Sequence, residues 1–346
     1  MRNKKILILL LLMPLYSLAQ TGGTAIYKFL NFTTSPRIAA MGGSLLSIKD
    51  DDINLAFLQP AFITSKINNQ LSFNYVDYFS DINYGSLVLG KSIKNLGNFT
   101  AGLIYTNYGT FKRADEQGNL EGSFNASDYA LSIGWGRMLD SMFSMGANLK
   151  LIYSSYDEIN SLGMAVDVGA AYHNQNKQLT ISVLAKNIGF QFKPYYTSNR
   201  ETLPFEIDLG LSKKLKHIPL RYSIIYHDLQ KWDISYQAES GISSNTSFDG
   251  STLTKKSKLE TYADLFMRHI ILGGELTFFK NFNFRLAYNY GKRQELKIDS
   301  KASTVGLSWG FGFRISKFSI NYARSAYHLS GSPNYISITT NLSNFF

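Results

Sequence analysis

The sequence predicts an all-β fold, namely a 14-stranded antiparallel β-barrel that spans an outer membrane and carries an N-terminal hatch. The first reason is alternation: residues 282–290 place Phe, Leu and Tyr between Asn, Arg and Ala, and residues 305–315 place apolar residues between Gly, Ser and Arg. A period of two puts the two sets on opposite faces of a strand. An aromatic-rich face opposite a small and polar one is typical of a strand between lipid and a polar lumen.

The second reason is the spacing of the strand-like segments. The even-numbered segments are followed by short spacers, such as 94–96 and 216–217. The odd-numbered segments are mostly followed by longer spacers, above all 229–266. This rhythm is typical of barrels with tight periplasmic turns and long extracellular loops, and an even strand count places both chain ends in the periplasm. We expect strands at 69–78, 82–93, 97–112, 124–138, 141–155, 160–173, 177–187, 202–214, 218–228, 267–280, 282–293, 301–315, 317–328 and 334–346.

The third reason is the N-terminus. Basic residues precede an apolar run at 6–12, and Ser17 to Ala19 provide a small-residue cleavage site before Gln20. We therefore expect residues 1–19 to be a signal peptide. The run is too short to span a membrane comfortably, and no later segment offers the roughly 20 apolar residues of a transmembrane helix. Residues 20–346 are then one barrel domain, exported to the outer membrane.

Residues 20–66 differ from the strand region at 67–346, because they alternate poorly and carry pairs of glycines. Ser35 and Pro36 predict the start of a short helix, with proline at its first position. We expect this segment to form a hatch inside the barrel. The alternative is a disordered periplasmic leader, which the aliphatic content of the segment argues against.

The composition limits the chemistry. The chain has no cysteine, which excludes disulfides and thiolate metal sites. Its formal charge is +10, but Lys and Arg are scattered without a dense run. We expect no nucleic-acid partner; attraction to outer-membrane lipid and anionic lipopolysaccharide explains the charge better.

We expect no enzyme activity, no catalytic residue and no cofactor. Gly306, Ser308 and Gly310 match a nucleophile-elbow pattern, but that motif needs a strand, a turn and a helix, and here it lies within a predicted strand. The five histidines show no metal-ligand spacing. The weak metal candidates are three consecutive carboxylates that could bind Ca²⁺, although pairing with Lys and Arg is favoured: Asp50, Asp51 and Asp52.

Several charged residues of both signs are predicted to face the lumen, so mutual pairing is expected there. The cations are Lys150, Lys186, Arg221, Arg285 and Arg314, and the anions are Asp167, Glu206 and Asp208.

The N-terminal region resembles a known family over about residues 21–62. The matching stretches are Gly22-Gly23, Tyr27–Leu30, Ser35-Pro36-Arg37-Ile38-Ala39-Ala40-Met41-Gly42-Gly43, Asp50–Ala56 and Gln59-Pro60-Ala61. They resemble the PorV/PorQ family of the type IX secretion system, PorQ above all, within the FadL-like outer-membrane barrels. Gln59 departs from the asparagine of the family pattern, and asparagine serves turns better.

The resemblance implies a non-catalytic component of the surface attachment complex, with PorZ-like, PorU-like and PorV-like partners. In that role the barrel would anchor the PorZ-like protein at the cell surface for cargo processing and attachment. The alternative is a FadL-type transporter of small hydrophobic molecules.

The longest connection, 229–266, is the expected partner-binding element, because binding residues often lie on loops carried by a rigid scaffold. The alternative is a solvated loop without a partner. Its basic and aromatic candidates are Lys255, Lys256, Lys258, Tyr262 and Phe266.

Overall fold

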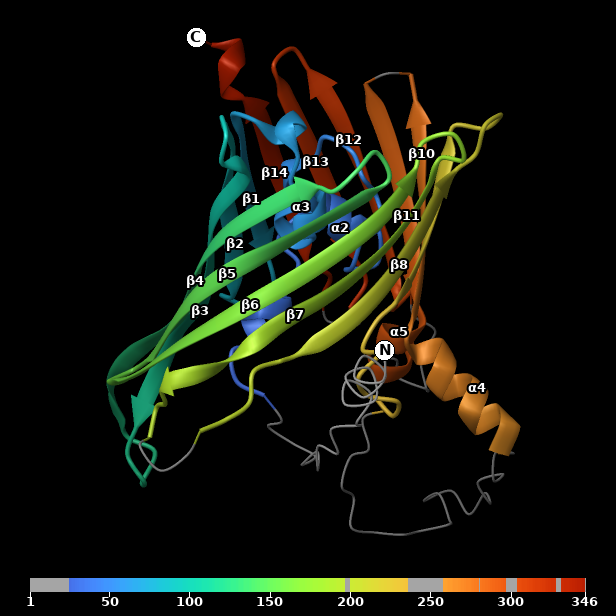
Figure 1. Ribbon diagram of the computed structural model, residues 1–346. Coiled ribbons are helices and arrows are strands. Elements are labelled where there is room, and N and C mark those ends of the chain that lie inside the picture. The colour runs from blue at the N-terminus through green and yellow to red at the C-terminus, as the bar shows by residue number, and fades with distance from the viewer. Residues whose placement is uncertain are drawn as a thin grey trace, which may run out of the picture.

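The chain folds into a closed barrel of fourteen antiparallel strands (Figure 1). Each strand pairs with its neighbours along the chain, and β1 pairs with β14 to close the barrel. This computed structural model describes residues 25–196, 200–235, 258–279, 281–296, 304–327 and 331–345. The predicted fold class is therefore confirmed. The predicted signal peptide and the terminal Phe346 lie outside the described residues.

Every one of the fourteen predicted segments contains a strand. The strands are β1 (Gln70–Asp77), β2 (Asn83–Ile93), β3 (Gly97–Ala114), β4 (Leu120–Met138), β5 (Phe143–Tyr156), β6 (Ile159–Asn174), β7 (Leu179–Lys193), β8 (Glu206–Lys214), β9 (Leu220–Tyr226), β10 (Ile270–Phe278), β11 (Phe282–Asn289), β12 (Leu307–Ile315), β13 (Phe318–Ser325) and β14 (Asn334–Asn341).

Some predicted boundaries were wrong. β8 begins after Pro204, which has no N–H to donate to a sheet. The predicted end of β11 is instead helix α5 (Tyr290–Leu296), whose Lys, Arg, Gln, Glu and Leu are good helix formers. The end predicted for β14 is the 3-10 helix η4 (Leu342–Asn344), so the last strand is shorter than its alternating pattern indicated.

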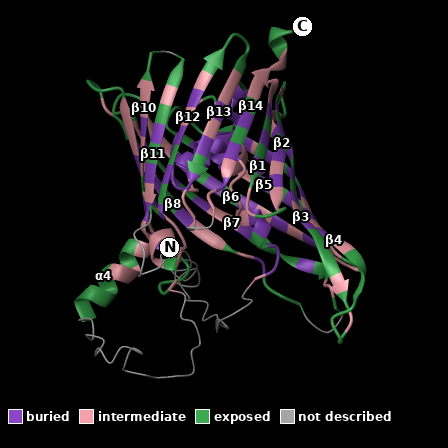
Figure 2. Cartoon of the chain, turned by 180° about the vertical axis from the view of Figure 1, so that it is seen from behind, coloured by how far each residue is buried: buried purple, intermediate pink, exposed green. Residues whose placement is uncertain are grey.

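Buried and exposed residues alternate along the strands (Figure 2). The buried ones are mostly small or polar, and many of the exposed ones are large and apolar. On β1, Ser72 and Asn74 are fully buried, whereas Phe73 is 54% exposed and Tyr75 is 41% exposed. The same inversion recurs around the wall and gives an outer apolar belt, as lipid contact requires. Within the described part of the chain, no helix is long and apolar enough to cross a membrane.

The two ends of the barrel differ. One end, the short-turn end, carries the tight connections after the even-numbered strands, together with the last described residues (Figure 1). The other, the long-loop end, carries the connections after β7, β9, β11 and β13. The wall is also uneven, because β3 to β7 have 14 to 19 residues and the remaining strands have 7 to 11.

Residues 25–69, here called the inner segment, lie within the lumen (Figure 1). The segment contains η1 (Lys28–Asn31), α2 (Pro36–Ala40), α3 (Ile53–Leu58), η2 (Pro60–Phe62) and η3 (Ser65–Ile67). Helix α2 starts at Pro36 as predicted, since proline suits the first helical position. It ends at Ala40, and Gly42 and Gly43 shortly beyond it both have positive φ angles that favour glycine.

The inner segment contacts every strand of the wall. Helix α2 packs on β11 to β14, α3 packs on β1 to β3, and η2 packs on β4 to β6. On the remaining wall, Ser182 of β7 and Ser212 of β8 donate hydrogen bonds to backbone carbonyls of the segment. Ion pairs connect the segment to the last two strands, from Asp50 to Arg221 of β9 and from Arg37 to Glu275 of β10. The segment is therefore held around the whole circumference.

Glycines in the wall allow this close packing. A Cβ on Gly146 of β5 would lie 2.2 Å from the carbonyl oxygen of Pro60, and one on Gly169 of β6 would lie 1.8 Å from Oε1 of Gln59. Gln59 accepts a hydrogen bond from Ala61 N and donates one to the carbonyl of Val183 at 3.1 Å. Gln59 thus supports the local turn and also binds the wall.

The described chain begins and ends at opposite ends of the barrel. Ile26 N donates to the carbonyl of Thr202 at 2.9 Å in the connection after β7, whereas Phe345 lies beside the short turns. The expectation that both termini face the periplasm concerns residues 1 and 346, which lie outside the described residues.

Candidate functional site

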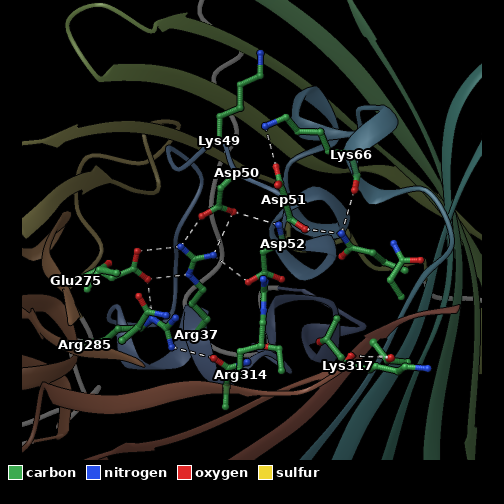
Figure 3. Close-up of a pocket in the computed structure, with 18 of the residues that line it drawn as sticks. Arg37, Lys49, Asp50, Asp51, Asp52, Lys66, Glu275, Arg285, Arg314 and Lys317 are labelled. Carbon is green, nitrogen blue, oxygen red and sulfur yellow. Dashed lines mark hydrogen bonds and ion pairs between the residues drawn. The ribbon is translucent and has the colours of Figure 1, made fainter. Parts of the chain in front are cut away.

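The most densely charged part of the lumen is a cluster centred on Arg37 of α2, here called the hub (Figure 3). It joins the inner segment to the wall through alternating positive and negative side chains. Its members are Arg37, Asp50, Asp52, Arg221, Glu275 and Arg285.

Arg37 contacts three carboxylates at once. Its Nε lies 2.9 Å from Oε2 of Glu275, and its Nη2 lies 2.6 Å from Oδ2 of Asp50. Its Nη1 lies 3.1 Å from Oδ2 of Asp52. Burial alone would lower the pKa of Arg37, but Asp50, Glu275 and Asp52 outweigh burial and raise that pKa well above its usual value. Arg37 therefore stays charged inside the barrel.

The wall side of the hub depends on strand register. Glu275 of β10 lies directly opposite Arg221 of β9 and Arg285 of β11. Its Oε2 is 2.7 Å from Nε of Arg285, and its Oε1 is 3.4 Å from Nη1 of Arg221. Residues 271, 273 and 275 alternate inward, so the period of two that buries Ile271 also delivers Glu275 to the lumen. The side chain of Glu275 is only 4% exposed.

The acidic triplet does not converge on one point. Asp50 and Asp52 contact Arg37, while Asp51 points to Lys66, whose Nζ is 3.0 Å from its Oδ1. Among the described residues there is no group of three His, Cys, Asp or Glu side chains placed to hold a metal ion. The contacts of the triplet are those of ion pairs with Lys and Arg.

The other predicted luminal charges are also paired, with one exception. Lys150 lies 2.8 Å from Asp167, and Lys186 lies 2.6 Å from Glu206 and 3.2 Å from Asp208. These contacts confirm the predicted mutual pairing of luminal charges. The exception, Arg314, is exposed near the short turns and forms no ion pair with any residue that the structure describes.

A polar cavity of about 740 Å³ opens beside the hub at the short-turn end (Figure 3). Its lining includes the hub and three further cations that have no acidic partner in the described chain: Lys49, Arg314 and Lys317. Burial, and then the nearby charge of Lys66, lower the pKa of Lys49. The cavity is therefore a positively charged vestibule.

A second cavity, of about 70 Å³, lies between the inner segment and β3 to β7. Apolar side chains such as Phe32, Phe57 and Ile104 share its lining with the paired Lys150 and Asp167. Typical ligand pockets have about 300 Å³ or more. This cavity is too small for such a ligand unless the inner segment moves.

The nucleophile-elbow pattern, residues 306–310, lies at the start of β12. Ser308 is buried on the inner face of β12, where its Oγ donates to the carbonyl of Ala40 at 3.4 Å, and the chain continues as strand. The described geometry gives this serine a structural contact in place of the strand–turn–helix context of the motif.

The predicted partner-binding residues lie at the long-loop end. Lys258, Tyr262 and Phe266 belong to helix α4 (Lys258–Arg268), which corrects the expectation of a loop up to residue 266. The apolar spacing of Leu259, Tyr262 and Phe266 suits a helix better than an irregular loop. Lys255 and Lys256 lie outside the described residues.

Sequence reasoning missed the two central residues of the hub. Arg37 was noted only within the resemblance, and Glu275 was not assigned to the lumen. Counting the alternation through Gly273 and Gly274 would have found Glu275. Nothing in the spacing of the chain indicates that Arg37 meets a residue 238 positions away.

No protein-family model matches the chain, and no curated protein matches it. Solved outer-membrane channels are similar in structure. The toluene transporter TodX of Pseudomonas putida is 12% identical with a TM-score of 0.48, over 89% of this chain and 97% of its own. A FadL homologue of Pseudomonas aeruginosa is 13% identical with a TM-score of 0.49, over 89% and 98%. The KdgM porin is 6% identical with a TM-score of 0.34, over 78% and 98%.

Proposed function

We propose that the protein is a non-catalytic outer-membrane anchor of the type IX attachment complex, which holds a PorZ-like partner at the cell surface beside PorU-like and PorV-like proteins. One observation carries the scaffold part of this proposal: the inner segment lies in the lumen and contacts all fourteen strands. A barrel braced in this way is a rigid platform for its surface loops.

The choice of complex rests on the resemblance of residues 21–62, whose features have clear structural uses. Arg37 forms the hub, Asp50 and Asp52 complete it, and Gln59 binds the wall. Partners would meet the long-loop end, and the basic balance of the chain suits the surrounding lipopolysaccharide.

A second function, FadL-type transport of small hydrophobic molecules, is favoured by the cavity of about 70 Å³, because the inner segment lines it with apolar side chains such as Phe32 and Phe57 and the wall adds Ile104. A shift of the inner segment would enlarge it. The large cavity does not support this function, because its lining is charged and polar.

Affinity purification tests the anchor. The tagged protein is purified from outer membranes, and co-purifying chains are identified by mass spectrometry. We expect a PorZ-like protein, and its absence from the cell surface when this barrel is deleted. Normal surface display in the deletion strain would contradict the anchor role.

Uptake and conductance test the alternative. Cells with and without the protein are compared for uptake of a labelled monoaromatic hydrocarbon, and the purified barrel is recorded in bilayers. The anchor predicts equal uptake and low conductance, with higher conductance once residues 25–66 are deleted. Protein-dependent uptake would instead support transport.

A further inference from the structure

Helix α4 exposes its apolar side and packs its polar side against the protein, the reverse of a helix on a soluble protein. None of its residues is buried, and Leu259 is 79% exposed, Tyr262 61% and Phe266 45%. Positions i, i+3 and i+7 share one side of a helix, so these three side chains form a single exposed stripe. We call it the apolar stripe of α4.

The opposite side of α4 faces the protein through polar contacts. Asp264 and Arg268 are partly buried, with Nε of Arg268 2.8 Å from Oδ2 of Asp264. The hydroxyl of Tyr290 in α5 donates to Oδ1 of the same carboxylate at 2.7 Å. A surface helix of a soluble protein buries its apolar side against the core. Here the polar side is packed and the apolar side is presented outward.

The barrel wall has the same inversion, and α4 adjoins it. The ring of Phe266 packs on Tyr226 at the end of β9, with ring centroids 5.6 Å apart. Below this contact, Ile224 of β9 and Leu272 of β10 are 40% and 44% exposed on the outer face. In both views α4 projects sideways from the long-loop end of the barrel (Figures 1 and 2). The apolar stripe is therefore continuous with the lipid-facing belt.

We propose that α4 lies in the outer leaflet of the membrane, with its apolar stripe in contact with lipid. Amphipathic helices at membrane interfaces bury such a face at the boundary of headgroups and acyl chains. Tyrosine is suited to that depth, and Lys258 at the start of the helix suits anionic headgroups. The proposal holds for either function above, since it concerns how the barrel sits in its membrane.

A partner protein is the competing occupant, because Tyr262 and Phe266 are also the predicted partner-binding residues. Continuity with the belt favours lipid. A protein partner would have to cover a stripe that joins the lipid-facing wall without a polar rim between them, whereas protein interfaces have polar rims.

The absence of native cysteine allows a clean test. Single variants Leu259→Cys and Tyr262→Cys carry an environment-sensitive fluorophore, and Thr261→Cys, on the opposite side of the helix, is the matched control. Each protein is placed in nanodiscs with lipids that bear a nitroxide quencher. We expect quenching roughly threefold or more greater at 259 and 262 than at 261, and blue-shifted emission at both.

Equal quenching at the three positions would overturn the proposal. Shielding of 259 and 262 that appears only in the complex purified from outer membranes would also overturn it and assign the stripe to a protein partner. Unchanged heat-modifiable migration on gels shows that each labelled barrel is folded.

Discussion

Helices α2 and α4 obey opposite rules within one molecule. All five residues of α2 are buried, including the charged Arg37, whereas none of the eleven residues of α4 is buried despite its leucine and aromatic side chains. The difference follows from the position of each helix: α2 lies in the lumen and packs on β11 to β14, whereas α4 lies outside the closed wall (Figure 1). Polar content alone therefore does not tell whether a helix of such a protein is inside or outside; the direction in which its polar side faces does.

The two helices also differ in how their unfavourable groups are compensated. Arg37 loses water but gains three carboxylates at ion-pair distance. The apolar stripe of α4 has no protein partner of comparable extent among the described residues, only the ring of Tyr226. Removing compensation from the inside should thus cost more than any change at the long-loop end.

The largest effect is expected for Glu275→Gln. The amide keeps the shape of the side chain but leaves Arg37 and Arg285 with an excess of buried positive charge. Breaking a buried ion pair on one side costs about 3–5 kcal/mol. Urea unfolding of the reconstituted barrel measures this loss.

Glu158→Gln is the control, because Glu158 is 84% exposed and its Oε1 lies 3.9 Å from Nη1 of Arg113. Its exposed pair should contribute less than about 1 kcal/mol. If both variants unfolded at the same urea concentration, the hub would not brace the barrel.

A smaller effect is expected for Gly42→Ala, at the end of α2. Gly42 has a φ of 95°, and a Cβ there would lie 2.3 Å from Cγ2 of Ile271 on β10. Gly118→Ala isolates the backbone cost, since its φ is 86° and nothing lies within 4 Å of the added atom. The strain shared by both variants is about 1–2 kcal/mol, and the clash adds about 1–3 kcal/mol at Gly42 alone. Equal unfolding free energies would show that the inner segment yields at this contact.

The smallest effect concerns Asp228 at the long-loop end. Burial alone would raise its pKa, but the hydrogen bond and charge of His227, at 2.7 Å, and then Gln230 outweigh burial and lower that pKa. A depressed carboxyl pKa stabilises the fold above the unfolded value and loses this contribution as pH falls through the folded value. The stability difference between the wild type and Asp228→Asn should therefore shrink between about pH 6 and about pH 3. A constant difference over that range would refute the pairing.

The sequence predicted the wall better than its contents. The period of two located all fourteen strands and the inward charges from Lys150 to Arg285, because each strand carries its own two-faced pattern. The sequence did not predict helix α4 at the end of the longest connection, because the helical apolar spacing there begins only at Leu259.

The hub could not be predicted, because its geometry depends on contacts between distant parts of the chain. Glu275 meets Arg221 and Arg285 through strand register, and Arg37 reaches them only when the inner segment is docked. Alternation reports which face a residue occupies, and it carries no information about which luminal residue lies opposite.

The contacts of the inner segment bear on how the barrel finds its correct closure. A slip of the β1–β14 seam by two residues would keep every side chain on its proper face, so alternation does not forbid it. Asn54 of α3 donates to Ser72 at 3.0 Å and accepts from Asn74 at 2.8 Å on β1, while α2 packs on β13 and β14. The inner segment precedes the strands in the chain and contacts both sides of the seam. Its contacts can therefore favour one register of β1 and β14 during assembly.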